Sequence, residues 1–289
     1  MRLVVGSIPT RPTKKRKEMK NIILFDMDGT LTEARQKIEP EMVNQVLEIL
    51  EQGHEVGIVT GSPEEYLNHQ LGDLIELVVE VGHGPNFHIM PCNGTEYIFY
   101  NEKGERNEIV PDNMQTHLGE KNFLELMAAL SNLQTEIAGQ FWRNDLPLTG
   151  TFIQYRGSMI NWCPIGRNAN NDQRKKFSEW DVENEFRERY AKVLKAWVNW
   201  RDFPLTVALG GSTSFDIYPT GWDKTYCLNW FGDHTCWFIG DKCKEGGNDQ
   251  QLYDILKKTG RAYETTGPED TAAIIRGILN TLSPDSSAG

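Results

Sequence analysis

Several features are missing from this 289-residue sequence, and each absence excludes a class of protein. No apolar run approaches the roughly 18–20 residues of a membrane-spanning helix, so no membrane association is expected. The five cysteines are odd in number and never spaced as Cys-x-x-Cys. This argues against a disulfide framework and favours a reduced, cytoplasmic protein. No Walker-type phosphate loop, internal repeat or low-complexity stretch occurs.

Positive charge is also scarce: 30 Lys and Arg residues stand against 41 Asp and Glu residues, which gives a net charge of −11. Such a balance argues against general binding to nucleic acids or anionic membranes. The first 20 residues are the exception, with seven Lys and Arg residues against one acid, Glu18. They lack the apolar segment of a secretion signal. We interpret residues 1–20 as a basic, disordered extension, with a transit peptide or a nuclear signal as alternatives.

Strand and helix signals alternate from residue 21 onward. An apolar run at 21–25 ends in an Asp-Gly turn and predicts a buried strand. A helix is expected from Pro40 to Gly53, a second buried strand at 55–59, and another helix from Pro63. Strand, helix and strand in this order form the βαβ unit of a parallel sheet.

The middle of the chain follows a different pattern, with hairpins mixed with long helices. Hairpins are predicted at 96–110, 151–163 and 205–218, and helices at 121–138 and 181–199. The α/β pattern then resumes, with strands at 236–239 and 261–264 and helices at 226–231, 249–258 and 268–282. We therefore predict an α/β fold: a core with a parallel sheet, formed by residues 21–98 and 219–283. Into it is inserted an α+β cap with an antiparallel sheet, residues 99–218.

Polar residues follow three of the predicted core strands, where the reactive groups of open parallel sheets collect. They are Asp26 and Asp28, Thr60 and Ser62, and Asp241 with Asn248 and Asp249. Two aspartates one residue apart can divide the chemistry: one carboxylate attacks phosphorus and the other transfers protons. Mg²⁺ suits such a site, because a hard cation with oxygen ligands offsets the repulsion between anions. An ordinary Asp-Gly turn is the alternative interpretation of the first pair.

The segment 26–32 (DMDGTLT) resembles the first motif of the haloacid-dehalogenase (HAD) superfamily. More narrowly, the chain resembles the eukaryotic-type phosphomannomutases over nearly all of residues 21–282. Four segments carry the resemblance: 24–35 (LFDMDGTLTEAR), 150–167 (GTFIQYRGSMINWCPIGR), 214–224 (SFDIYPTGWDK) and 238–249 (FIGDKCKEGGND). The two middle segments are the more specific to the mutase family. The resemblance implies a HAD-like Rossmannoid core with an inserted cap.

The resemblance also implies roles for the matching residues. Asp26 would be the nucleophile that forms an aspartyl-phosphate, and Asp28 the general acid and base. Mg²⁺ would be held by Asp26, the backbone carbonyl of Asp28, and Asp241. The phosphate-binding residues would be Thr60, Gly61, Ser62 and Lys224. The substrate-binding residues would be Arg35, Arg156, Arg167, Arg174, Ser214 and Asp216.

The arginines of this set also make chemical sense on their own. A bisphosphorylated sugar has two anionic ends, so it needs a second phosphate site away from the first. Guanidinium groups bind phosphate bidentately and keep their charge at any working pH. Arg156, Arg167 and Arg174 all fall in the predicted cap. A single surface arginine is more often simply solvated, and Ser214 and Asp216 have the alternative of an ordinary strand edge.

Four segments depart from the family pattern. Thr60 stands where glycine is more usual and resembles the superfamily's phosphatases. Residues 82–94 are rich in Gly, Pro and Asn, and we expect a loop there; its His83, His88 and Cys92 lack a metal-ligand spacing. Ser212 and Thr213 replace apolar residues. The poor match at 253–255 leaves a second, structural cation near Tyr253 open.

The sequence thus predicts a Mg²⁺-dependent enzyme that interconverts mannose 6-phosphate and mannose 1-phosphate, activated by a hexose 1,6-bisphosphate. The resemblance implies a role in GDP-mannose synthesis and a homodimer formed through the cap. A HAD-type sugar-phosphate phosphatase is the alternative function, and a non-catalytic interaction protein is disfavoured by the intact acidic residues. The preferred hexose, mannose or glucose phosphate, and the mutase-to-phosphatase ratio stay open.

Overall fold

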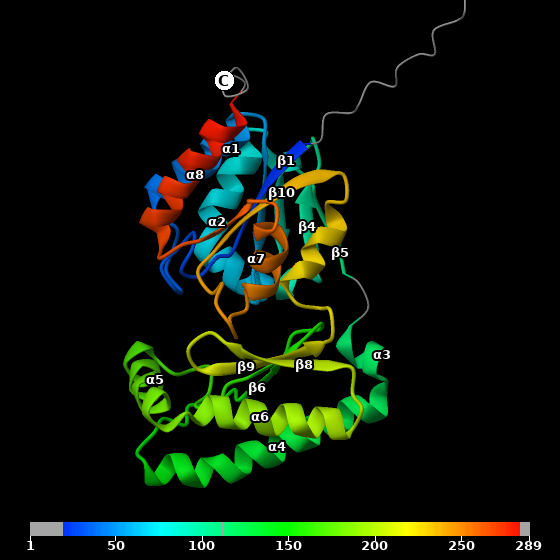
Figure 1. Ribbon diagram of the computed structural model, residues 1–289, viewed down its shortest axis with the longest axis vertical. Helices are drawn as coiled ribbons and strands as arrows, with labels where there is room; N and C mark the ends of the chain where they lie inside the picture. Colours follow the sequence, from blue (N-terminus) through cyan, green and yellow to red (C-terminus); the bar gives the residue numbers. More distant parts are fainter. Residues whose placement is uncertain (1–19, 111–112, 284–289) are drawn as a thin grey trace, which may run out of the picture.

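The computed structural model describes residues 20–110 and 113–283, which form a core and a cap stacked along the long axis of the molecule (Figure 1). The predicted extension 1–20 lies outside the described residues, apart from Lys20, which begins the first strand. No helix among the described residues is long and apolar enough to cross a bilayer. The predicted fold class is confirmed: a large, mostly parallel sheet and a separate antiparallel sheet.

The core sheet has seven strands in the order β11-β10-β1-β2-β3-β4-β5. The first five strands are parallel to one another, and the last two pairings, β3 with β4 and β4 with β5, are antiparallel. The strands are β1 (Lys20–Phe25), β2 (Glu55–Val59), β3 (Phe87–Met90), β4 (Tyr97–Tyr100), β5 (Arg106–Ile109), β10 (His234–Gly240) and β11 (Ala262–Glu264). β2 is buried along its whole length, as its apolar run predicts.

Helices cover both faces of the core sheet. On one face an apolar cluster joins the strands to α1 (Pro40–Glu51), α2 (Glu64–Glu80) and α8 (Pro268–Leu282). On the other face a second cluster joins them to α7 (Gln250–Lys257) and to the 3₁₀ helix η3 (Lys224–Trp230). Because adjacent strand residues point to opposite faces, Ile23 and Phe25 belong to the first cluster and Ile22 and Leu24 to the second.

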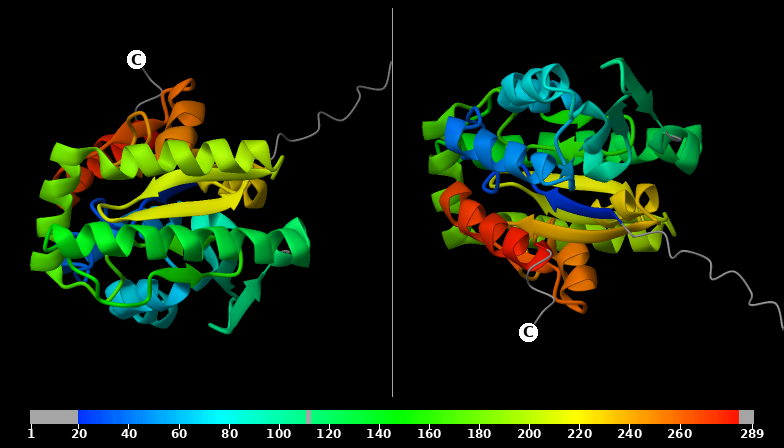
Figure 2. Two further views of the ribbon diagram at one scale, coloured as in Figure 1. Left: turned by 90° about the horizontal axis from the view of Figure 1, so that it is seen from below. Right: turned by 90° about the horizontal axis from the view of Figure 1, so that it is seen from above.

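The cap is a four-stranded antiparallel sheet covered by helices on one face. Its strands run in the order β6 (Ile153–Tyr155), β7 (Ile160–Trp162), β9 (Ser214–Pro219) and β8 (Leu205–Gly210). Its helices are α3 (Met114–Leu118), α4 (Glu120–Arg143), α5 (Asn171–Asn184) and α6 (Phe186–Trp200). Seen from below, α4 and α6 lie on the side of the cap that faces away from the core (Figure 2).

Strand alternation decides which side chains of the cap sheet face the core. Trp162 on β7 and Phe215 and Ile217 on β9 pack into the cap's apolar cluster. Their neighbours Asn161 and Asp216 point the opposite way and are paired in register across the two strands. One face of this sheet is therefore an apolar layer, and the other presents polar groups to the core.

Three sequence predictions about these elements are wrong. Residues 99–110, predicted for the cap, complete the hairpin β4–β5, and this hairpin extends the core sheet because β4 pairs with β3. The expected loop at 82–94 contains β3 and two single-turn 3₁₀ helices, η1 (Gly84–Asn86) and η2 (Cys92–Gly94). The helix expected at 181–199 is two helices, broken at Glu185, whose φ is +50°.

Candidate functional site

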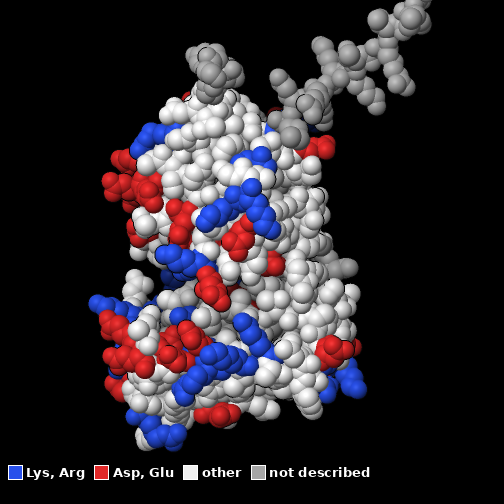
Figure 3. Space-filling model, in the orientation of Figure 1, with Lys and Arg blue, Asp and Glu red and all other residues white. Residues whose placement is uncertain are grey.

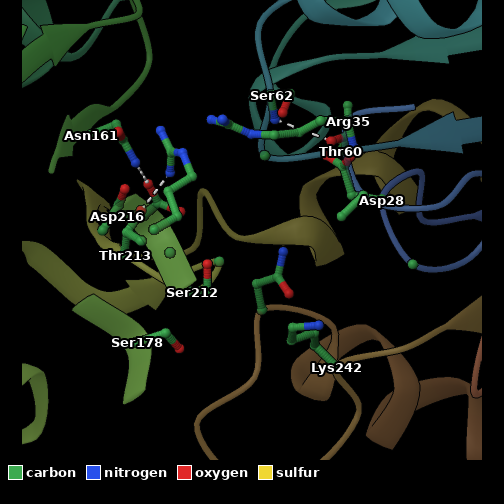
Figure 4. A pocket seen from close by; sticks show the side chains of 18 of the residues that line it. Asp28, Arg35, Thr60, Ser62, Asn161, Ser178, Ser212, Thr213, Asp216 and Lys242 are labelled. Atoms are coloured by element: carbon green, nitrogen blue, oxygen red, sulfur yellow. Dashed lines mark hydrogen bonds between the residues drawn. The ribbon is translucent and has the colours of Figure 1, made fainter. Parts of the chain in front are cut away.

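A cleft of about 580 Å³ lies between the core and the cap. The space-filling view shows the molecule indented at this boundary, with both acidic and basic side chains around it (Figure 3). The close-up shows the core residues Asp28, Thr60 and Ser62 on one side and the cap residues Asn161, Thr213 and Asp216 on the other (Figure 4). β10, β1 and β2 are neighbours in the sheet, so their carboxyl ends meet at one wall of the cleft.

The centre of the core wall is a buried cluster of charged groups. Asp26 follows β1 and its backbone N–H donates to Ile239 O over 3.0 Å, which extends the β1–β10 pairing by one residue. Lys224 Nζ donates to Asp26 Oδ1 and, over 2.5 Å, to Asp249 Oδ1. Lys224 and Asp249 are almost fully buried. One ammonium group is therefore shared between two carboxylates.

The cluster has more negative than positive charge. Burial, together with the nearby Asp249 and Asp241 carboxylates, raises the pKa of Asp26 to about 8, although the charge of Lys224 acts against the rise. Burial alone would lower the pKa of Lys224, but the Asp249 and Asp26 carboxylates outweigh it and raise that pKa. Burial also raises the pKa of Asp241. Such shifts are typical of sites that bind or process charged ligands.

The same carboxylates suit a divalent cation. Oxygen atoms of Asp26, Asp241 and Asp249 lie within 4.8 Å of one another. Asp241 Oδ1 is buried and has no hydrogen-bond partner among the residues that the structure describes, although Asp241 Oδ2 contacts Lys242 Nζ. A Cβ on Gly29, whose φ is +85°, would lie 2.6 Å from Asp241 Oδ2, so only glycine fits beside this carboxylate. Mg²⁺ prefers hard oxygen donors such as these carboxylates. The unpartnered Asp241 Oδ1 is one oxygen atom that such an ion would satisfy.

Asp28 is held at the edge of the cleft rather than in the buried cluster. The backbone N–H of Arg35, a residue with φ +66°, donates to Asp28 Oδ1 over 2.8 Å. The buried amide of Gln70, on α2, also reaches this carboxylate. When the Gln70 amide is oriented so that its nitrogen faces the neighbouring acceptors, Gln70 Nε2 lies 3.1 Å from Asp28 Oδ1 and 3.0 Å from Thr32 Oγ1. Two donors therefore fix the orientation of Asp28 while it lines the cleft.

A tight turn after β2 forms the adjoining part of the core wall. Thr60 Oγ1 accepts a hydrogen bond of 3.1 Å from the backbone N–H of Ser62. Gly61 lies so close to Asn93 that a Cβ there would be 3.3 Å from the Asn93 Oδ1 atom. Gly61 O accepts a hydrogen bond of 2.8 Å from Arg156 Nη1 of the cap. The turn thus links the core to the cap across the cleft.

The cap wall presents a connected set of polar groups. Asn161 Nδ2 donates to Asp216 Oδ1 over 2.7 Å, and Arg167 Nη1 donates to Asn161 Oδ1 over 2.8 Å. Burial raises the pKa of Asp216, although nearby Arg156 and Asn161 act against it. Ser214 lies two residues earlier on the same face of β9 and lines the cleft.

The cap arginines are held by neutral oxygen atoms. Arg156 Nε donates to Gln154 Oε1 and Arg167 donates to Asn161, as above. Arg174 donates to the backbone carbonyls of Ala169 and Arg167 and to Thr213 Oγ1. Within residues 20–110 and 113–283, no carboxylate forms an ion pair with Arg156, Arg167 or Arg174. These arginines therefore have no carboxylate in direct contact beside the cleft, although the Asp216 charge acts on Arg156 and Arg167 from farther away.

The structure brings the predicted site residues together. All of them line the cleft except Lys224, which is buried beneath Asp26: Asp26, Asp28, Arg35, Thr60, Gly61, Ser62, Arg156, Arg167, Arg174, Ser214, Asp216 and Asp241. In the described part of the chain one group of acidic side chains has metal-binding geometry: Asp26, Asp241 and Asp249. Cys92, His83 and His88 form no such cluster among these residues; His88 instead bonds Glu55 and Tyr97.

Sequence reasoning missed three residues of the site, Gln70, Asn161 and Thr213, and one contact, that of Asp249 with Lys224. The alternation of β7 would have placed Asn161 on the polar face, opposite its apolar neighbours Ile160 and Trp162. Asp249 was recognised beside a strand end, but nothing local pairs it with Lys224. Gln70 has no signal of its own, because its partner is 42 residues away in the sequence.

Solved structures of other proteins share this fold. Plasmodium falciparum IMP-nucleotidase, truncated and bound to IMP, superposes with a TM-score of 0.63 at 16% identity, covering 91% of this chain and 69% of that one. A haloacid dehalogenase-like hydrolase from Bacteroides thetaiotaomicron superposes with a TM-score of 0.54 at 14% identity, covering 90% and 99%. This chain therefore shares the overall fold of these two proteins.

Sequence comparison is more specific. A sequence model described as eukaryotic phosphomannomutase matches residues 43–281. A phosphomannomutase of Schizosaccharomyces pombe is 34% identical over 274 residues, 93% of this chain and 98% of that protein. One of Drosophila melanogaster is 35% identical over 275 residues, 93% and 99%. The chain belongs to the eukaryotic phosphomannomutase family, which confirms the resemblance noted in its motifs.

Proposed function

We propose that this enzyme interconverts D-mannose 6-phosphate and α-D-mannose 1-phosphate through an aspartyl-phosphate on Asp26 and a hexose 1,6-bisphosphate. One observation carries the proposal: the cleft has two separate ends suited to phosphate. Asp26 lies at the core end, beside Lys224. Three arginines that donate to neutral oxygen atoms and have no carboxylate ion pair among the described residues lie on the cap wall. A sugar with two phosphates matches this arrangement, because each end can hold one anionic group.

The first half of the cycle transfers a phosphoryl group to the protein. An Asp26 carboxylate oxygen attacks a phosphorus atom of the bisphosphate, and the bond between that phosphorus and the sugar oxygen breaks. Asp28, in its acid form, gives its proton to the departing sugar oxygen. Lys224 offsets the negative charge that gathers near Asp26 during this transfer. The products are the aspartyl-phosphate and a hexose monophosphate.

The second half reverses these roles. A hexose monophosphate binds with its free hydroxyl toward Asp26 and its phosphate toward Arg156, Arg167 and Arg174. Asp28, now a carboxylate, takes the hydroxyl proton as the sugar oxygen attacks the aspartyl-phosphate, and Asp26 leaves as a carboxylate. Asp216 and Ser214 would contact sugar hydroxyls. The residues that bind the phosphate groups do not distinguish the orientation of a sugar hydroxyl. Glucose phosphates are therefore also expected as substrates.

Mg²⁺ is the proposed metal, held by Asp26, Asp241 and the backbone carbonyl of Asp28, with Asp249 beside it. When bound, it would offset the repulsion between the carboxylates and the transferring phosphoryl group. The donor set and the unpartnered Asp241 Oδ1 support this assignment.

Water must be kept from the aspartyl-phosphate if sugar is to be the acceptor. The hydrogen bond from Arg156 to Gly61 O and the position of the Arg167 guanidinium over the Tyr66 ring, 5.2 Å from its centroid, join the cap to the core. A cap held against the core excludes water from the cleft. A sugar-phosphate phosphatase would need a cleft that admits it.

The test is a single incubation of the purified enzyme with Mg²⁺ and mannose 1-phosphate, with and without glucose 1,6-bisphosphate. Mannose 6-phosphate and free phosphate are followed together. We expect mannose 6-phosphate, formed faster with the bisphosphate, and little free phosphate. Free phosphate as the main product would instead identify a sugar-phosphate phosphatase.

We also propose that the enzyme is a cytoplasmic homodimer that supplies mannose 1-phosphate for GDP-mannose synthesis. The five cysteines are free and buried, as suits a reducing compartment.

The proposed dimer surface is the edge of the cap sheet at β6. Tyr155 of β6 packs on Phe123, and Leu124 beside it is exposed. Light scattering should give a dimer for the wild type. It should also give a dimer for the control Trp142→Glu, which changes an exposed apolar residue elsewhere on the cap. It should give a monomer for Leu124→Glu; a monomeric wild type would contradict the dimer.

A further inference from the structure

Thr213 is a buried polar residue that links two parts of the cap. It directly precedes β9 and is 2% exposed. Its Oγ1 atom accepts a hydrogen bond of 2.7 Å from Arg174 Nη1, on α5, and a weaker one of 3.6 Å from Cys163 Sγ, after β7. The close-up shows it beside Asp216 on the cap wall of the cleft (Figure 4). In the sequence it stands where the family pattern has an apolar residue.

The hydrogen bonds of Arg174 fix its guanidinium plane at all three nitrogen atoms. Nε donates to Ala169 O over 3.0 Å, Nη2 to Arg167 O over 2.9 Å, and Nη1 to Thr213. A guanidinium group has five N–H bonds in a rigid plane. Three are occupied, which leaves one on each terminal nitrogen. These two N–H bonds remain available to the oxygen atoms of a phosphate group.

The three acceptors orient Arg174 without neutralising it. All of them are uncharged oxygen atoms, unlike the acceptor of Arg187 nearby on α6, which is the Asp181 carboxylate at 2.7 Å. Burial lowers the pKa of Arg174 to about 10, and the neighbouring charge of Arg35 adds to this. The group therefore stays protonated at neutral pH but is short of compensating charge, which favours an anion.

We propose that Thr213 is a positioning residue, whose hydroxyl oxygen holds the Arg174 guanidinium in the orientation that binds the distal phosphate of the sugar. Of the three acceptors it alone is a side chain, so it alone can be removed by substitution. Without it, one N–H of a half-buried guanidinium loses its partner, and the group can rotate away from the phosphate. This inference rests on the proposed role of Arg174 in substrate binding.

The test compares Thr213→Val, which keeps the shape and removes the acceptor, with Thr213→Ser, which keeps the acceptor. Thr271→Val is the matched control: Thr271 is a buried threonine on α8 whose hydroxyl lies 2.9 Å from Thr265 Oγ1. We expect Thr213→Val to raise the KM for mannose 1-phosphate about tenfold, with kcat within about twofold. Thr213→Ser and Thr271→Val should keep the wild-type KM.

A merely structural role for Thr213 gives a different result. An unchanged KM in Thr213→Val, or an equal rise in Thr213→Ser, overturns the proposal. Thr213→Ala also removes the acceptor, and it must give the same separation of KM from kcat if the valine variant folds poorly. On an Arg174→Lys background, Thr213→Val should add nothing further, since the two residues act as one unit; additive effects would place the action of Thr213 elsewhere.

A second measurement needs no substrate. Phenylglyoxal reacts with accessible guanidinium groups, and mass spectrometry reports its rate at Arg174. We expect the rate to rise several-fold in Thr213→Val and to stay at the wild-type value in Thr213→Ser. An unchanged rate in Thr213→Val overturns the positioning role. If the rate rises but the wild type does not interconvert hexose phosphates, the proposed function fails and the positioning of Arg174 stands.

Discussion

The two ends of the core sheet contain opposite arrangements of buried charge. At the carboxyl ends of the strands, Lys224 is shared by Asp26 and Asp249, with Asp241 close by. At the amino ends, one carboxylate, Glu55, is surrounded by Lys20 Nζ at 2.6 Å, His88 Nε2 at 3.1 Å and His234 Nε2 at 3.0 Å. At one end a single ammonium group is shared among several acids, whereas at the other a single carboxylate has an ammonium group and two imidazole rings around it.

The pKa values at the two ends move in opposite directions. Burial raises the pKa of both carboxyl groups. For Asp26 burial prevails and the pKa is about 8. For Glu55 the hydrogen bonds from His88 and Lys20 outweigh burial and lower the pKa to about 2. Compensated charge stabilises a fold, whereas uncompensated charge leaves a site in need of a ligand. The comparison locates chemistry at the carboxyl ends and stability at the amino ends.

The largest effect is expected from Asp26→Asn, which removes the proposed nucleophile. Turnover should fall at least about 1,000-fold, because an amide cannot form the acyl-phosphate. The melting temperature should not fall, since the change also removes one carboxylate from an overcrowded cluster. Mannose 6-phosphate formation and a thermal melt check the two parts. Retained activity would exclude Asp26 as the nucleophile.

The opposite pattern is expected from Glu55→Gln, at the amino ends of the strands. Here the free energy of unfolding should fall by about 3 kcal/mol, because a pKa held near 2 instead of 4.5 corresponds to that stabilisation. The kcat and KM values should be unchanged at a temperature where the variant is folded. Urea denaturation and steady-state kinetics make the comparison.

The pH dependence of this stabilisation has a definite sign. A lowered folded-state pKa gives stability that is present in full above 4.5 and is lost as the pH falls toward 2. The wild type should therefore lose its advantage over Glu55→Gln as the pH is lowered from 6 to about 3. A difference in stability that stays constant over this range would show that the Glu55 charge is not its source.

The carboxyl-end wall could be predicted because it depends on local signals. Apolar runs ending in Asp26, Thr60 and Asp241 indicate parallel strands, and parallel strands place their ends together. The short strand β3 lacked such a signal, because its four residues lie between segments rich in Gly, Pro and Asn. The break between α5 and α6 depends on Asp181, whose carboxylate accepts from both the backbone and the side chain of Arg187.

Contacts between distant segments were outside the reach of sequence patterns. Lys224 and Asp26 are 198 residues apart, and Arg174 and Thr213 are 39 apart. The family resemblance identified the first pair as site residues without saying that they touch. It indicated nothing for Thr213, which departs from the family pattern. Such contacts follow from the packing of whole elements, so only the folded structure contains them.

A smaller effect is expected from Arg174→His, which removes one uncompensated charge at the cap end of the cleft. The KM for mannose 1-phosphate should rise about 30-fold, the value of one charged, bidentate contact of about 2 kcal/mol, with little change in kcat. Arg201→His is the matched control, since Arg201 is paired with Glu125 in the cap. It should lower the melting temperature and leave KM alone. Equal KM values for the two variants would remove Arg174 from the site.

The smallest effect is expected from Thr60→Ala, which removes a neutral hydrogen bond from the carboxyl-end wall. The Thr60 hydroxyl accepts from the backbone N–H of Ser62, and this bond holds the turn that carries Gly61. Losing it should cost about 1 kcal/mol of transition-state stabilisation, or about fivefold in kcat/KM. The ratio of free phosphate to mannose 6-phosphate decides what the hydroxyl does. An unchanged ratio means that Thr60 only shapes the turn, whereas a fall in free phosphate would mean that the hydroxyl also helps water to compete with sugar.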